Sequence, residues 1–269
     1  MAAVVATRRP DLLSLAREQL GADPFDGLAE GAGFVQPALY CASLACWEQA
    51  GRPRGEMIAG HSLGELAALV AGDALDEEEG LRLAVVRGRL MEEAAAASPG
   101  GMMAVLGAGA AGAAADVATR LGLTVANDNA PGQVVLSGPT TGLAEARLEL
   151  RAAGLKAIRL PVAGAFHSPA MGLAAAQFRE ALATVAFRRP RVPVYSSIAA
   201  APFSDARAGL AAALTKPVRW RQTVAQMHAA GAREFVEVGP GDVLTGLIHR
   251  GALDDVEAYS LAAAEAVHA

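Results

Sequence analysis

The chain has 269 residues, 53% of them hydrophobic, which suffices for one large domain or for one domain carrying a smaller insertion. Its net charge of −5 argues against a nucleic-acid-binding protein, because such proteins usually carry a basic excess. No apolar run approaches the ~20 residues of a membrane span, and the N-terminus lacks the pattern of a secretory signal. We therefore expect a cytoplasmic protein, a monomer by default, that binds neither nucleic acid nor membrane.

The two cysteines, Cys41 and Cys46, lie in one predicted helical stretch. They have no metal-type spacing and no cluster of other metal-binding residues around them. We interpret them as buried thiols in a reducing cytosol and predict no metal site.

The first hundred residues predict helices around one short apolar strand. The strand is expected at 56–60, and the helices at 35–50, 63–71 and 77–97.

The middle of the chain changes character and predicts a β-α-β-β-α-β order, the ferredoxin-like pattern. Turn formers in NDNAPG separate its second and third strands. We expect a compact subdomain at 100–163, inserted into a discontinuous unit formed by 1–99 and 164–269. The strands are expected at 102–107, 122–126, 133–137 and 156–162, and the helices at 110–121 and 140–153.

Helices and strands alternate again in the last hundred residues. Helices are expected at 169–185, 217–230 and 242–250, and strands at 191–197, 233–238 and 256–261. This alternation favours an α/β fold with a mostly parallel sheet covered on both faces, similar to the α/β-hydrolase core.

The most informative stretch is EMIAGHSLGELAALVA at 56–71, in which an apolar strand meets Gly-His-Ser-Leu-Gly and passes into a helix. This is the context of a nucleophile elbow, where glycines permit a tight turn and the serine is exposed at the sheet edge. Ser62 is therefore the candidate nucleophile, although a glycine-rich turn with a capping serine would give the same short pattern.

A serine nucleophile needs a base, and the chain has five histidines. His61 is adjacent to Ser62, and neighbouring side chains on a turn rarely pair as nucleophile and base. His228 and His249 lie on predicted helices, and His268 lies near the C-terminus. His167, in GAFHSP, follows the inserted subdomain on a loop that can overhang a cleft; taken alone it also fits a surface histidine.

Together these residues resemble the family of malonyl-CoA:acyl carrier protein transacylases and polyketide-synthase acyltransferase domains. The matching segments occur in family order and cover about 35–261: GHSLGE at 60–65, VRGRLM at 86–91, NDNAPGQVVLSG at 127–138, GAFHSP at 164–169, PVRW at 217–220 and EVGPGDVLTGL at 237–247.

The resemblance implies that Ser62 becomes acylated and that His167 is its general base, oriented by a group in the region of Ala213 to Thr215. It also implies substrate-binding residues, among which Arg87 would hold the malonyl carboxylate, Leu63 would give a backbone N–H to the oxyanion, and Phe166 would favour malonyl over methylmalonyl. The set is Arg87, Asn129, Leu63, His61 and Phe166.

The implied reaction transfers malonyl from malonyl-CoA to the phosphopantetheine thiol of an acyl carrier protein, in fatty acid or polyketide biosynthesis, and needs no cofactor. The carrier is acidic in this family, so basic residues beside the cleft are candidates for its docking: Arg188, Arg189, Arg191, Lys216, Arg219 and Arg221.

One departure from the family lies at the N-terminus. Family members begin with a strand and a glycine-glutamine-glycine-serine-glutamine loop that gives a second oxyanion donor, and residues 1–20 contain no such segment. We expect either a shortened chain or another donor. A serine hydrolase on a similar elbow and a catalytically impaired homologue are the alternative interpretations.

Overall fold

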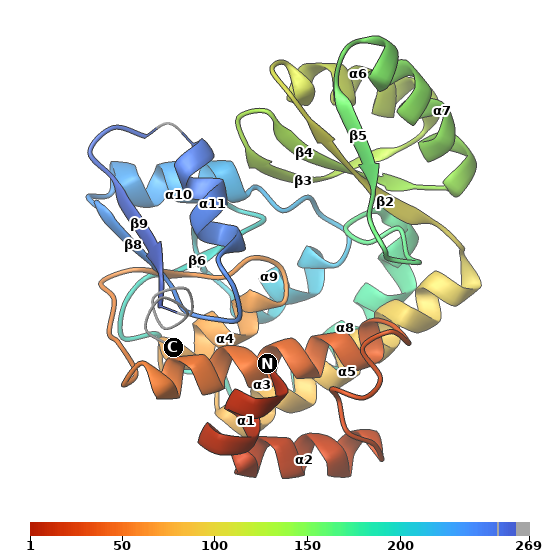
Figure 1. The fold of residues 1–269 in the computed structure, drawn as a ribbon. Helices are drawn as coiled ribbons and strands as arrows, with labels where there is room; N and C mark the ends of the chain where they lie inside the picture. Colours follow the sequence, from red (N-terminus) through yellow and green to blue (C-terminus); the bar gives the residue numbers. More distant parts are fainter. Residues whose placement is uncertain (252, 262–269) are drawn as a thin grey trace.

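A computed structural model describes residues 1–251 and 253–261 and has a mixed α/β architecture (Figure 1). The predicted strand near 256–261 is present, whereas His268 lies outside the described residues. No helix in the described part of the chain is long and apolar enough to cross a membrane.

Two helices that the sequence patterns did not predict open the chain. Helix α1 (Ala2–Arg8) and helix α2 (Pro10–Leu20) pack on α3 (Ala32–Gln49), and α2 also packs on α5 (Glu77–Ala97). Pro10 begins α2, where its missing N–H costs no hydrogen bond, and Gly21 ends it with a φ of 70°. Residues 1–31 contain no strand.

Strand β1 (Ile58–Ala59) lies at an edge of a three-stranded sheet and leads into α4 (Gly64–Ala71) and then α5. Strand β1 pairs in parallel with β6 (Val194–Ser196), and β6 pairs antiparallel with β7 (Ala201–Pro202). The largest hydrophobic cluster surrounds this unit, and most of its side chains come from α3, α4, α5 and α8 (Gly172–Ala183).

The middle of the chain forms a four-stranded antiparallel sheet in the order β3-β4-β2-β5. The two helices, α6 and α7, lie together beside it (Figure 1) and share a hydrophobic cluster with its strands. The ferredoxin-like pattern is therefore confirmed. Its elements are β2 (Gly101–Leu106), α6 (Ala110–Leu121), β3 (Thr124–Ala130), β4 (Gln133–Gly138), α7 (Thr140–Ala152) and β5 (Lys156–Arg159).

A single bridge between Pro99 and Gly164 joins the chain where it enters and leaves this region. The bridge fits the division that the sequence suggests, in which 100–163 is a small subdomain and 1–99 with 164–269 is the larger unit. Those domain boundaries stay a prediction.

One prediction for this region is wrong in detail. The segment NDNAPG is not a turn throughout, because residues up to Ala130 continue β3 with two register shifts. The extension is held from outside the hairpin: the Asp128 N–H donates to the Val218 carbonyl at 2.8 Å, and the Val218 N–H donates to Ala126 at 2.8 Å. Because of this pairing, β3 continues toward the larger unit, and Asn129 lies in that extension of the strand.

The last hundred residues largely follow the predicted order, although α9 and β7 were not predicted. The predicted helix at 169–185 begins as a short 3₁₀ turn (Pro169–Met171). The strands β8 and β9 pair in parallel as a separate sheet, so the parallel core consists of two small sheets, with the antiparallel strand β7 at an edge. The elements are α8 (Gly172–Ala183), α9 (Ala206–Ala213), α10 (Trp220–Ala229), β8 (Glu234–Glu237), α11 (Val243–Arg250) and β9 (Glu257–Ser260).

Candidate active site

The turn between β1 and α4 has the backbone strain of a nucleophile elbow. Ser62 adopts a φ of 53°, a left-handed conformation that is uncommon for a residue with a side chain. A Cβ atom on Gly60 would lie 2.1 Å from the Gly64 carbonyl carbon, so only glycine fits there. The sequence thus folds locally into a turn that holds Ser62 at the N-terminal end of α4.

His167 lies against this serine. Its Nε2 is 2.8 Å from the Ser62 Oγ, and its Nδ1 is 2.7 Å from the Ala213 carbonyl oxygen. Because a carbonyl only accepts hydrogen bonds, Nδ1 carries the proton and the Nε2 lone pair faces the serine hydroxyl. The carbonyl lies within the region that the resemblance implies, and no acid is needed as a third member.

Burial keeps His167 neutral. It lowers the pKa of His167 to about 3, and the positive charge of Arg87 acts in the same direction. His167 also has a φ of 56°, so both partners of the nucleophile–base pair are held in strained backbone conformations. A neutral imidazole beside a serine hydroxyl is the arrangement that general-base catalysis requires.

Arg87 is brought to the same place from α5. Its side chain is 3% exposed, and its Nη2 donates to the Ser62 Oγ at 3.1 Å, while its Nη1 donates to Gln36 Oε1 at 2.7 Å. Both partners are uncharged, and burial lowers the pKa of Arg87 to about 10 against the opposing field of Glu65. The guanidinium is therefore a buried cation without a carboxylate contact among the described residues.

The other arginines of α5 behave as surface residues. Arg82 pairs with Glu79 at 2.9 Å, and Arg89 with Glu93 at 3.7 Å. The resemblance implied a substrate contact for Arg87, and of these three arginines Arg87 alone is buried.

Glu65, in the first turn of α4, is a buried residue that the sequence analysis did not single out. Its Oε1 accepts from the Ser197 N–H at 2.7 Å and from the Ser197 Oγ at 2.9 Å, whereas its Oε2 has no hydrogen-bond partner among the described residues. Burial raises the pKa of Glu65 to about 7, although the Ser197 hydrogen bonds and Arg87 oppose the shift. A carboxylate in an otherwise apolar helix was the signal that could have revealed it.

His61 and Asn129 form a separate pair in this region. His61 Nε2 is 2.9 Å from Asn129 Oδ1, and the His61 ring lies 5.6 Å from the ring of Trp220. Burial lowers the pKa of His61. His61 thus pairs with Asn129 and not with Ser62.

The remaining site residues lie close to the nucleophile in sequence or in space. The Leu63 N–H meets no hydrogen-bond acceptor in the described part of the chain, so it is free to donate to an oxyanion. The Phe166 ring adjoins Gly164, where a Cβ would lie 2.3 Å from the ring. The second oxyanion donor stays a prediction.

The two groups of basic candidates lie in different places. Arg188 and Arg191 donate backbone hydrogen bonds to Ala74 and Gly72, beyond the C-terminal end of α4, which is about 12 Å long. That group is therefore remote from Ser62. The other group surrounds the segment that pairs with β3, and Arg221 forms an ion pair with Asp128 at 2.7 Å.

Gln36 and Ser197 were also missed by the sequence analysis. Gln36 is an amide near the start of an apolar helical stretch, which is a weak signal, and its buried side chain orients Arg87. Ser197 gave no signal, because its contact with Glu65 spans 132 residues. No group of three or more possible metal ligands occurs in the described residues.

Comparison with known proteins places this geometry in a family. The family model for the acyl transferase domain matches residues 11–265. The malonyl CoA-acyl carrier protein transacylase of Escherichia coli is 39% identical over 226 residues, which cover 80% of this chain and 73% of that protein.

A second relative is much longer than this chain. The polyketide biosynthesis protein ThaF of Burkholderia thailandensis is 37% identical over 268 residues, which cover 93% of this chain but only 23% of that protein. Among solved structures, the malonyl-CoA:acyl carrier protein transacylase of Xanthomonas oryzae pv. oryzae is 33% identical, with a TM-score of 0.88 and coverage of 100% of this chain and 93% of that one. The chain belongs to the acyl transferase family, the family that its serine, histidine and arginine motifs resemble.

Proposed function

We propose that the chain transfers a malonyl group from malonyl-CoA to the phosphopantetheine thiol of an acyl carrier protein, through a malonyl ester on Ser62. One observation carries the choice of acyl group: the buried guanidinium of Arg87 has only uncharged partners and lies 3.1 Å from the Ser62 Oγ. A carboxylate on the acyl group would supply the missing negative charge, because guanidinium can grip a carboxylate through two parallel hydrogen bonds.

In the first half of the reaction, His167 Nε2 takes the proton of Ser62 as the Oγ attacks the thioester carbon. The Leu63 N–H and the N-terminal end of α4 stabilise the oxyanion. The C–S bond then breaks, and the coenzyme A sulfur leaves with the proton from His167. In the second half, the carrier thiol gives its proton to His167, attacks the ester, and Ser62 is reprotonated.

The proposed carrier protein is supported by the relatives named as acyl carrier protein transacylases. Of the two basic groups, Lys216, Arg219 and Arg221 are the better candidates for its docking, because they follow Ala213, whose carbonyl orients His167. Acidic carriers would be attracted there by charge complementarity. A monomer stays our prediction.

Phe166 is proposed to exclude an α-methyl group. Its ring adjoins Gly164, next to the base, and one methyl group usually gives discrimination of about 1–3 kcal/mol. We expect Phe166→Ala to narrow the preference for malonyl over methylmalonyl, measured as the ratio of acylation rates. A wild-type protein that loads both thioesters equally would contradict this role.

The proposed function is tested by intact-protein mass spectrometry after mixing with malonyl-CoA. We expect an adduct of about 86 Da, the mass of a malonyl group, that carrier protein removes. Ser62→Ala should abolish the adduct and keep the fold, while Ser98→Ala, at an exposed serine after α5, is a control for loss of a different hydroxyl. Rapid release of malonate without carrier would indicate a hydrolase, and the absence of both adduct and turnover would contradict the proposal.

A further inference from the structure

The buried charges around the nucleophile are unequally matched. Arg87 and Glu65 are 3% and 1% exposed, and each acts on the other through space, since neither belongs to a direct pair. Glu65 Oε1 is engaged by Ser197, and the Arg87 donors are engaged by Gln36 and Ser62. In the free protein the Glu65 carboxylate thus offsets the charge of the Arg87 guanidinium without forming a direct ion pair with it.

The other groups that pack around Glu65 contribute no charge. Helix α4 contacts α3, α5, β1 and β6. From these elements Ser197 donates hydrogen bonds to Glu65, the Ser196 side chain weakly favours the ionised form, and Arg87 alone acts by charge. The two histidines of the site are held neutral by burial. Any new negative charge beside Arg87 therefore counteracts the positive charge that favours the ionised form of Glu65.

Glu65 also has a free position for a proton. Its Oε2 is buried and has no hydrogen-bond partner in the part of the chain that the structure describes, an arrangement that disfavours the ionised form. The Ser197 contacts are made by Oε1 alone, so protonation of Oε2 leaves them in place.

We propose that Glu65 is the buried counter-charge of Arg87 in the free enzyme, and that its Oε2 takes up one proton from solvent when a malonyl carboxylate pairs with Arg87. The inference rests on the proposed malonyl transfer. With malonyl present, a buried site would hold two anions and one cation, and a like charge nearby raises a carboxyl pKa. Because the pKa of Glu65 in the free enzyme is about 7, the carboxyl is about half ionised at pH 7, and the uptake approaches one proton only above neutral pH.

The proton has a direct consequence for substrate binding. Because malonyl binding takes up a proton, the affinity for malonyl-CoA falls as the pH rises above the pKa of Glu65 in the free enzyme. The linkage limit is about tenfold per pH unit. Acetyl-CoA brings no carboxylate and should show no such dependence. Glu65 is thus a positioning residue that sets how available Arg87 is to an acidic acyl group.

The experiment mixes full-length enzyme with malonyl-CoA in weak buffer containing a pH indicator and counts protons taken up per malonyl-serine formed. Glu65→Gln keeps an oxygen for Ser197 but cannot titrate, and it gives the baseline, including ionisation of the released thiol. Glu93→Gln, an exposed carboxylate on α5, is the matched control. We expect up to one proton more per malonyl group for the wild type and Glu93→Gln than for Glu65→Gln.

A second measurement needs no variant. The KM for malonyl-CoA of the wild type should rise between pH 7 and 9, at most about tenfold per unit, while that for acetyl-CoA stays level. Malonyl-serine formation with equal proton counts in wild type and Glu65→Gln, or parallel pH profiles for both thioesters, would overturn the inference alone. Failure to form malonyl-serine at all would overturn the proposed function as well.

Discussion

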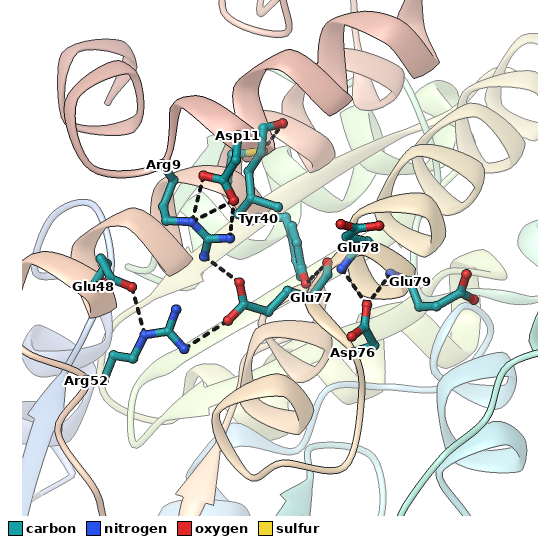
Figure 2. A network of polar contacts seen from close by, with 11 residues as sticks. Arg9, Asp11, Tyr40, Glu48, Arg52, Asp76, Glu77, Glu78 and Glu79 are labelled. Atoms are coloured by element: carbon teal, nitrogen blue, oxygen red, sulfur yellow. Dashed lines mark hydrogen bonds and ion pairs between the residues drawn. The ribbon is translucent and has the colours of Figure 1, made fainter.

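Arg9 and Arg87 are both nearly buried, with 8% and 3% of their surfaces exposed, yet their surroundings differ. Arg9 lies between α1 and α2 and belongs to an ion-pair network of side chains. Its guanidinium contacts Asp11 at 2.7 Å and Glu77 at 2.5 Å (Figure 2). Arg52 extends the network to Glu77 and Glu48. These carboxylates raise the pKa of Arg9 above its usual range.

Arg87 has no carboxylate partner within residues 1–251 and 253–261, and burial lowers its pKa to about 10. The difference teaches how to tell a structural arginine from a binding one: the first has its counter-charges within the chain, and the second leaves room for a carboxylate from the ligand. A buried charge of either kind is costly when it is left unpaired. The following predictions are ways to break or sharpen this comparison.

The largest effect is expected for substitution of His167, the general base whose pKa the positive charge of Arg87 helps to lower. His167→Ala should slow Ser62 acylation by about 10²–10⁴-fold, because a general base is lost. Stopped-flow or quenched-flow acylation by malonyl-CoA measures the rate. His249→Ala, an exposed histidine at the end of α11, is the control and should be unchanged. An unaffected rate in His167→Ala would remove His167 from the mechanism.

A smaller but more diagnostic change is expected in Arg87→Ala. Malonyl transfer should fall relative to acetyl transfer by a factor of about 30 or more, since breaking a buried charge pair costs about 2–5 kcal/mol. Arg87→Lys should restore only part of the preference.

The matched control for Arg87 is Arg89→Ala, two residues further along α5, whose partner is the exposed Glu93. The ratio of malonyl to acetyl loading should stay unchanged in this control. If the ratio also stays constant in Arg87→Ala, then Arg87 is structural like Arg9, and the comparison fails.

For Arg9→Ala we expect a loss of stability without a change in the preference for the acyl group. The free energy of unfolding should fall by about 2 kcal/mol, because charged hydrogen bonds that tie α2 to α5 are lost. The malonyl-to-acetyl ratio should be that of the wild type. Arg17→Ala removes the more exposed pair with Asp23 and should cost well under 1 kcal/mol. Equal costs for both variants in urea unfolding would contradict the structural role of Arg9.

The smallest effect is expected in the pH dependence of acetyl loading, which should be nearly flat. The neutral form of His167 is the base, and its pKa of about 3 means that this form persists as the pH falls from 8 to 5. The rate of acetyl loading should therefore stay nearly constant, whereas a histidine near its ordinary pKa would lose about tenfold per pH unit below it. A decline centred near pH 6.5 would show that His167 is more solvated than in this structure.

Local patterns in the sequence were enough to predict much of the fold. The period of apolar residues predicted α5 and the ferredoxin-like order, and the glycines around Ser62 predicted the elbow, because these features depend on residues close together in the chain. The resemblance then supplied Arg87 and His167. The helices α1 and α2 were missed, since both are short and Arg8, Arg9 and Pro10 interrupt the apolar pattern between them.

Tertiary structure alone decided how these parts become a site. It paired β1 with β6 across some 130 residues of chain and brought the Ala213 carbonyl to His167 over 46 residues. It also left Arg87 with uncharged partners and Glu65 with one unpartnered oxygen. The sequence alone shows which residues are ionisable. Whether such a charge has a partner depends on the side chains that pack around it, because distant segments exclude water from it only in the folded structure.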